Sequence, residues 1–173
     1  MCLEAFKCIH LHVSNPLVNC LAIIVRDSPL TYIIICAGAE SVIITDKTIT
    51  PAEINLKANQ HNLLDRNITV AQFEWGKDPS HLRPPFDVVL AADVIYIEET
   101  FPLLLQSLVD LSDRETVILL SCKRRYERDD RFFDLLRESG RFSYSVVWQW
   151  PKGEEEPQEL ENDVKVYKIR LVS

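Results

Sequence analysis

The chain has 173 residues and a mass of 20.0 kDa, which suits one domain with a sizeable core. Hydrophobic residues make up 47% and charged residues 26%, as in a soluble globular protein and unlike a disordered one. The formal net charge of -7 argues against general affinity for nucleic acid or anionic membranes and favours a partner with a basic surface.

The first forty residues show no signal for secretion or membrane insertion. Arg26, Asp27 and Pro29 divide the apolar stretch 17–39 into pieces shorter than the ~20 residues that a spanning helix needs. Residues 1–12 lack a basic region followed by a small-residue cleavage site. The five cysteines form no even, closely spaced framework, which favours a reducing compartment. The sequence therefore predicts a cytoplasmic protein, with the nucleus as an alternative location.

Apolar runs rich in β-branched residues alternate with amphipathic segments along most of the chain. The runs predict strands at residues 32–35, 41–46, 68–75, 86–93, 116–122, 142–150 and 163–172. The segments between them predict helices at about residues 50–62, 99–111 and 127–140. The first helix has a start signal, because Thr50 can cap it, Pro51 can take its first position and Glu53 can reach back to the cap amide.

This order of elements predicts an α/β protein with a doubly wound sheet. Residues 86–93 are apolar almost throughout, as expected of a central parallel strand covered on both faces. The last two strands alternate in polarity, which suits an antiparallel hairpin at the sheet edge, with the acidic stretch 151–162 as a solvated loop between them. Ligands of such sheets bind outside the carboxyl ends of the strands, where Asp46 and Asp93 both fall.

Six stretches carry a resemblance to one enzyme family. They read GAESVIITD, LKANQHN, FEWG, FDVVLAADVIYIEETFPLLLQSL, TVILLSCKRRYERDDRFFDLL and DVKVYKIR. The most specific element is the Asp-x-x-Tyr formed by Asp93 and Tyr96, which Glu98, Glu99 and a leucine-rich helix follow. With these stretches the chain resembles the class I, seven-stranded S-adenosylmethionine-dependent methyltransferases, and among them the non-SET protein-lysine methyltransferases that modify chaperones and translation factors.

The resemblance implies a Rossmann-like methyltransferase fold over residues 1–173, with S-adenosyl-L-methionine as cofactor and a protein substrate. The implied reaction transfers a methyl group to a lysine side chain of a cytosolic chaperone or elongation factor. We expect a monomer that binds neither nucleic acid nor membrane.

Three residues match the cofactor site of that family. Asp46 corresponds to the acidic residue that binds the ribose hydroxyls, and a carboxylate can accept both hydroxyl protons. Trp75 corresponds to a Trp beside the adenine, where an aromatic face can stack on the base. Ala92 corresponds to a small residue whose backbone lies against the cofactor. Two simpler interpretations stay open, a turn or helix-start role for Asp46 and packing beneath the following loop for Trp75.

Asp93 and Tyr96 match the residues at the mouth where the target lysine enters. Methyl transfer is an in-line displacement, so the enzyme must align a neutral amine with the methyl group and exclude water. A carboxylate and a phenol can orient that amine and stabilise the cation that forms. The alternatives are a helix N-cap for Asp93 and a core-edge aromatic for Tyr96.

The sequence departs from the family at its start. Its four glycines are Gly38, Gly76, Gly140 and Gly153, so the family's loop of the form Gly-x-Gly-x-Gly is absent. Residues 1–35 do not align with the family, so the first strand-helix unit is expected to be atypical or incomplete, with residues 20–25 or 31–35 in place of the first strand. Skipping of an exon, in a transcript or in a gene model, would produce such a break. The missing loop predicts weak cofactor binding and slow turnover, because glycine lets the backbone approach the methionine part of the cofactor.

Two other functions stay open. The first is a catalytically inactive protein that keeps the methyltransferase fold and binds the former substrate. The second is a methyltransferase for a small molecule or a nucleic acid, although the chain lacks an Asn-Pro-Pro-Tyr motif and the basic run 123–128 is offset by the acidic residues around it. No metal site is predicted, because Cys2, Cys8, His10 and His12 match no common zinc spacing.

Overall fold

The computed structural model describes residues 18–24, 39–58, 61, 67–150 and 164–172. Their strands are β1 (Asn19–Ile24), β2 (Ser41–Asp46), β3 (Asn67–Gln72), β4 (Val88–Ala92), β5 (Val117–Lys123), β6 (Phe142–Trp150) and β7 (Val164–Leu171). Their helices are α3 (Thr50–Ala58), α4 (Phe101–Asp110) and α5 (Asp130–Glu138), with short 3-10 turns at Ser80–Leu82, Glu98–Thr100 and Glu127–Asp129.

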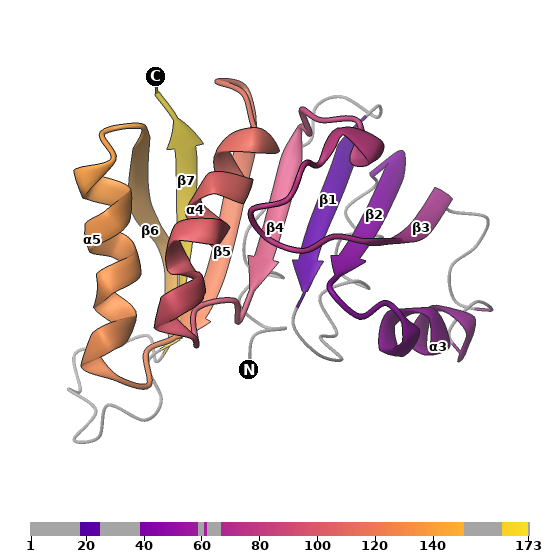
Figure 1. Ribbon diagram of the computed structural model, residues 1–173, viewed down its shortest axis with the longest axis horizontal. Coiled ribbons are helices and arrows are strands. Elements are labelled where there is room, and N and C mark those ends of the chain that lie inside the picture. The colour runs from indigo at the N-terminus through magenta and orange to yellow at the C-terminus, as the bar shows by residue number, and fades with distance from the viewer. Residues whose placement is uncertain (1–17, 25–38, 59–60, 62–66, 151–163, 173) are drawn as a thin grey trace.

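All the described strands join one seven-stranded sheet in the order β3-β2-β1-β4-β5-β7-β6. The pairs β1–β2, β2–β3, β1–β4 and β4–β5 are parallel, whereas β7 pairs with β5 and β6 in the antiparallel sense. The arrowheads of β1, β2, β4 and β5 therefore point to one edge of the sheet, the lower edge in Figure 1. This topology confirms the doubly wound sheet with a C-terminal antiparallel hairpin. The strand order reverses between β1 and β4, and such a switch point is where ligands bind in open α/β sheets.

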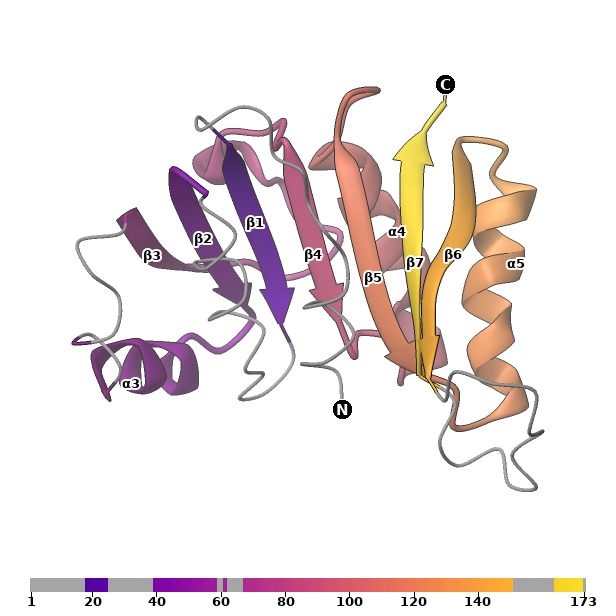
Figure 2. The same cartoon turned by 180° about the vertical axis from the view of Figure 1, so that it is seen from behind.

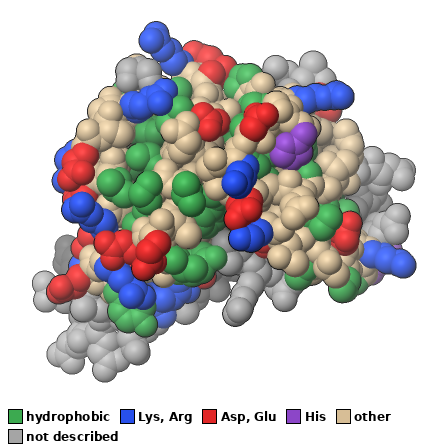
Figure 3. All heavy atoms as spheres, in the orientation of Figure 1, with side chains coloured by type: hydrophobic (Ala, Val, Ile, Leu, Met, Phe, Trp, Pro, Cys, Tyr) green, Lys and Arg blue, Asp and Glu red, His purple; other side chains and the backbone are tan. Residues whose placement is uncertain are grey.

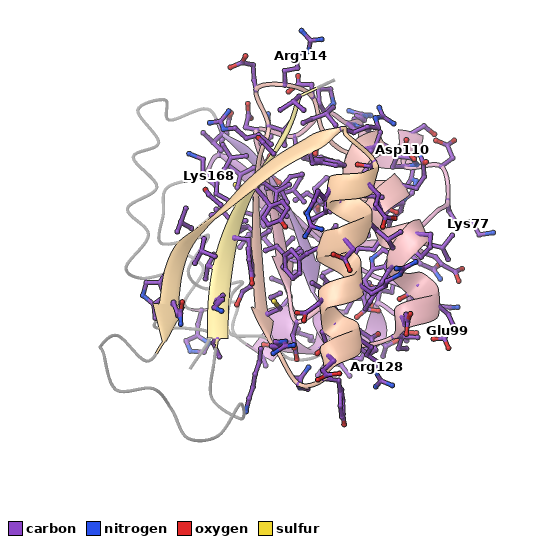
Figure 4. The ribbon with its side chains drawn as sticks, turned by 90° about the vertical axis from the view of Figure 1, so that its left-hand side faces the viewer. Lys77, Glu99, Asp110, Arg114, Arg128 and Lys168 are labelled. Carbon is purple, nitrogen blue, oxygen red and sulfur yellow. The ribbon has the colours of Figure 1, made fainter. Side chains whose placement is uncertain are left out.

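Helices α4 and α5 lie side by side on one face of the sheet, over the half that holds β5, β7 and β6 (Figure 1). Seen from behind, these two helices lie beyond the strands, and α3 lies below the carboxyl end of β2 (Figure 2). Figure 4 shows that Glu99 and Arg128, near the starts of α4 and α5, share one end of the molecule. Asp110 and Arg114 lie at the opposite end, so both helices begin at the carboxyl edge of the parallel strands.

The core explains why β4 is central. All five of its residues are buried, as the apolar run predicts. Helix α4 presents Phe101, Leu104 and Leu108 to the sheet with no exposed area, at the predicted helical spacing. The ring of Phe132 from α5 meets the ring of Phe101 edge-on, with 5.7 Å between centroids. Each of these side chains contributes about 1.5–3 kcal/mol by leaving water.

The predicted elements that fall within the described residues agree with the structure except at a few boundaries. Of the two candidates for the first strand, residues 20–25 correspond to β1, whereas 31–35 and the predicted strand 32–35 lie outside the described residues. Much of the segment between β1 and β2 is also outside them, so the atypical first unit stays a prediction. The same holds for the acidic loop and for the cysteines and histidines near residue 10.

The cap of α3 was predicted at Thr50, one residue too late. Thr50 is already helical, because the backbone N–H of Glu53 donates to the carbonyl of Ile49 at 3.0 Å. The turn that precedes the helix comes from Asp46, whose Oδ1 accepts the backbone N–H of Thr48 at 3.0 Å. Across the described part of the chain, no helix has the length and apolar character needed to cross a membrane.

Candidate active site

A cavity of about 250 Å³ lies at the carboxyl edge of the sheet beside the switch point. Asp46, Trp75 and Tyr96 all line it, so three of the five predicted site residues come together. They arrive from separate parts of the chain: the end of β2, the turn after β3 and the turn after β4. The other lining residues are Ile23, Thr45, Lys47, Phe73, Glu74, Ile97, Thr100 and Leu103.

Asp46 is half-buried at the last position of β2. Its backbone carbonyl accepts the N–H of Phe73 at 3.0 Å, and its register partner in β3 is Gln72. The Oδ1 atom also accepts the backbone N–H of Thr48, so the turn role that stayed open in the sequence is real. A carboxylate offers about four acceptor sites, and this bond occupies one of them. The turn therefore orients the carboxylate without using up its capacity to bind hydroxyl groups.

Trp75 is held at the cavity by the turn that follows it. It is half-buried and packs against the core cluster under α4. The N–H of Gly76 donates to Oγ of Ser107 at 2.8 Å, and this buried hydroxyl donates to the carbonyl of Leu103 at 2.9 Å. Gly76 has φ +76, and a Cβ there would lie 2.7 Å from Cδ2 of Leu103. Glycine adopts this backbone angle without strain, and a Cβ here would force the exposed side chain of Leu103 to shift.

The rim of the cavity is charged on one side and apolar on the other. Nζ of Lys47 lies 2.6 Å from Oε1 of Glu74, and both side chains are well exposed. Their hydrogen bond raises the pKa of Lys47 and lowers that of Glu74. On the other side, Ile97 and Leu103 are 41% and 47% exposed, beside Tyr96 at 38%. Tyr96 is therefore a rim residue and not a core-edge aromatic.

Asp93 and Ala92 do not line this cavity. Ala92 is buried at the end of β4 between its partners Ile24 and Ser121. Asp93 follows in the left-handed region, with φ 55, and its N–H donates to the carbonyl of Ser121 at 2.9 Å. Its two carboxylate oxygens each accept a guanidinium N–H of Arg125 at 2.9 Å.

These contacts do not support the helix-cap interpretation of Asp93. The cap positions of the next two helical segments are occupied by Ile97 and Thr100. Asp is among the few residues that visit the left-handed region readily, because its short polar side chain can bond locally. Here that conformation turns the chain sharply at the carboxyl end of β4.

Sequence reasoning missed Arg125 and most of the residues around the cavity. The basic run 123–128 was interpreted only as offset by the acidic residues around it, although Arg125 returns to the end of β4. Lys47, Glu74 and Ile97 each directly follow or precede a predicted site residue, and that adjacency was the available signal. Lys47 and Glu74 follow β2 and β3, and their ion pair depends on how these two strands are aligned. The sequence pattern alone does not fix that register.

The residues of the cavity fit the nucleoside part of S-adenosylmethionine. A carboxylate able to accept hydroxyl protons and an indole face lie in one cavity, and its walls include the apolar side chains of Ile23 and Phe73. Its volume of about 250 Å³ falls slightly below the roughly 300–1,000 Å³ range of small-molecule pockets. In the described part of the chain, no three His, Cys, Asp or Glu side chains are arranged to hold a metal ion.

Comparison with known proteins places this geometry in a family. Protein N-lysine methyltransferase METTL21A of Danio rerio is 43% identical over 112 residues, which is 62% of this chain and 50% of that protein. EEF1A lysine methyltransferase 3 of Xenopus tropicalis is 39% identical over 64 residues, 37% of this chain and 29% of that protein. The chain spans about half the length of the METTL21A proteins that it matches.

Solved structures share the fold at low identity. An rRNA methylase from Streptococcus thermophilus superposes with a TM-score of 0.67 at 9% identity, covering 91% of this chain and 89% of that one. The N-methyltransferase NodS from Bradyrhizobium japonicum, in complex with S-adenosyl-L-homocysteine, gives 0.61 at 14% identity, with 92% and 81% covered. These likenesses confirm the methyltransferase fold. Residues 22–139 match the model of the lysine methyltransferase family, and the chain belongs to that family.

Proposed function

We propose that this chain is an S-adenosylmethionine-dependent protein-lysine methyltransferase that acts in the cytoplasm on a chaperone or a translation elongation factor. The observation that carries the proposal is the meeting of Asp46, Trp75 and Tyr96 in one cavity. This cavity lies at the switch point of the sheet, in a chain that belongs to the lysine methyltransferase family.

The cofactor site follows from the chemistry of the cavity. Asp46 accepts the ribose hydroxyl protons with the acceptor sites that the bond from Thr48 leaves over. Trp75 offers its indole face to the adenine, and the turn at Gly76 holds the indole in place. Ala92, small and buried at the end of β4, lets the backbone approach the cofactor.

Asp93 and Tyr96 are proposed to receive the target lysine. When bound, S-adenosylmethionine supplies a sulfonium methyl group, which an uncharged amine attacks as the carbon–sulfur bond breaks. The Asp93 carboxylate, beside the cavity at the end of β4, and the Tyr96 phenol on its rim would hold the amine in line and stabilise the ammonium group that forms. Tyr96, Ile97 and Leu103 form an apolar rim that a docked protein would cover, and this keeps water from the reacting atoms.

The protein acceptor is supported by the names of the relatives and by charge. One relative is named for elongation factor 1A, and the others are named protein-lysine methyltransferases. The chain carries a net charge of -7, and acidic and basic side chains are intermingled on the face that bears α4 and α5 (Figure 3). A net negative charge suits a basic partner protein better than a nucleic acid.

A second candidate is a methyltransferase-fold protein that binds its partner without turnover. The observation that favours it is the set of only four glycines, which leaves no Gly-x-Gly-x-Gly loop for the methionine part of the cofactor. Losing two or three hydrogen bonds to charged groups, at roughly 1.5–3 kcal/mol each, would weaken cofactor binding by several kcal/mol.

One experiment separates the two candidates. The purified chain is incubated with S-adenosylmethionine labelled in its methyl group, together with purified elongation factor 1A or a purified cytosolic chaperone. The expected product is label on a lysine side chain, located by peptide mass spectrometry and lost when that lysine becomes arginine. Stable binding of an acceptor without label would favour the inactive candidate. Label on a nucleic acid or small molecule, with none on protein, would contradict the proposed acceptor class.

A further inference from the structure

Arg125 forms the most specific contact at the carboxyl end of β4. Its Nη1 and Nη2 atoms donate separately to Oδ1 and Oδ2 of Asp93, both at 2.9 Å, in the parallel arrangement of a guanidinium and a carboxylate. The two side chains are 40% and 42% exposed, so the pair is open to a docking protein and partly screened by water. A pair this exposed stabilises the fold only weakly.

The backbone of Arg125 is held in place by hydrogen bonds to the side chain of Asp129. Oδ2 of Asp129 accepts the backbone N–H of Arg125 at 2.8 Å and that of Tyr126 at 3.0 Å. Asp129 is only 6% exposed, and it stands directly before α5. A buried carboxylate thus fixes the loop after β5, and that loop aims the guanidinium of Arg125 back at β4.

Asp93 is therefore held at both ends. Its backbone N–H is tied to Ser121 of β5, and its carboxylate is tied to Arg125 in the loop that follows β5. The Asp93 side chain is 42% exposed, so without Arg125 its carboxylate would be free to change rotamer. The fork of Arg125 occupies one acceptor site on each oxygen, and a carboxylate has about four in all. The remaining sites stay available to an amine.

We propose that Arg125 is a positioning residue for methyl transfer, which holds the carboxylate of Asp93 in one orientation toward the target lysine. This inference rests on the proposed lysine methyltransferase activity. Arg125 acts through Asp93 and touches neither cofactor nor methyl group. Asp129 supports it by fixing the backbone of residues 125 and 126. A misplaced catalytic group costs up to about 100-fold in rate, so the effect of losing this orientation is large enough to measure.

Arg124 provides a matched control from the same loop. Its guanidinium also makes two bonds to one carboxylate, at 3.0 and 2.6 Å to Asp130, with side chains 36% and 54% exposed. Replacing Arg124 by alanine removes an ion pair of the same type without touching Asp93. A purely structural role for Arg125 would make the two alanine variants behave alike.

The test measures steady-state methyl transfer and cofactor affinity for the wild-type chain, Arg125→Ala, Arg125→Lys, Arg124→Ala and Asp93→Ala. Acceptors are purified elongation factor 1A and a purified cytosolic chaperone, assayed in parallel. Affinity for S-adenosylhomocysteine is followed separately by titration, and folding by melting temperature.

The expected result is a roughly 10- to 100-fold loss of kcat/KM for Arg125→Ala, carried by kcat, with the S-adenosylhomocysteine dissociation constant unchanged within two-fold. Arg125→Lys restores part of the loss, and Arg124→Ala stays near wild type. Asp93→Ala abolishes transfer, with the S-adenosylhomocysteine dissociation constant kept within a few-fold. Equal kcat/KM in wild type and Arg125→Ala, or equal losses in the Arg124 and Arg125 variants, would overturn this inference and leave the proposed function standing. No transfer by the wild-type chain to either acceptor would overturn the proposed function and this inference with it.

Discussion

Replacing Asp46 by asparagine tests the cofactor site with little change of shape. The amide oxygen can still accept the N–H of Thr48, so the turn before α3 is kept while the charge is lost. A hydrogen bond to a charged group contributes about 1.5–3 kcal/mol, and 1.4 kcal/mol corresponds to a factor of ten. The dissociation constant for S-adenosylhomocysteine should therefore rise roughly 10- to 100-fold in Asp46→Asn.

The assay follows the indole N–H of Trp75 by NMR in protein labelled with 15N-tryptophan, since the sequence has only three tryptophans. This method reports weak binding directly. Asp78→Asn is the matched control, because Asp78 also accepts a backbone N–H two residues on, from Ser80 at 2.9 Å, and does not line the cavity. An unchanged dissociation constant in Asp46→Asn would remove Asp46 from the cofactor site.

Three further predictions follow from the same structure. Asp93→Ala should abolish methyl transfer in the labelled-methyl assay, with S-adenosylhomocysteine affinity kept within a few-fold; an active variant would contradict its role at the lysine. Gly76→Ala should lower the melting temperature and cofactor affinity more than Gly140→Ala, because both have positive φ but only a Cβ at Gly76 meets another side chain; equal effects in calorimetry would refute this. Burial, with a smaller contribution from the charge of Asp87, raises the pKa of the Cys20 thiol from 9.0 to about 12. The neutral thiol should therefore make its full contribution to the free energy of unfolding below pH 9, and that contribution should fall as the pH rises toward 12. Denaturant unfolding of Cys20→Ala beside wild type checks this, and equal pH dependence of the two would contradict it.

The sheet could be predicted because its signals are local. The fully apolar run at β4 and the leucine spacing of α4 each indicate one type of element, and the alternating strands near the C-terminus indicate a hairpin. The cap of α3 was predicted one residue too late, at Thr50, because the carbonyl that accepts the first helical bond belongs to Ile49, a residue with no capping side chain.

The candidate site was predictable in part. Asp46 and Tyr96 stand at or just beyond the ends of predicted strands, where the rule for parallel sheets places ligands. Arg125 was not predictable in the same way, because its contact with Asp93 joins residues 32 positions apart through a left-handed turn. The sequence of the basic run does not distinguish Arg124 from Arg125. In the structure Arg124 bonds to Asp130, whereas Arg125 bonds to Asp93 at the end of β4.

The most direct test of a nucleoside site at this edge of the sheet is titration of the wild-type chain with S-adenosylhomocysteine, observed at the indole N–H of Trp75. We predict a saturable shift of that resonance with a dissociation constant on the order of millimolar, because the glycine loop is missing while the ribose and adenine contacts remain. A Trp75 resonance that does not move at saturating ligand would contradict the site, and micromolar binding would contradict the predicted weakness.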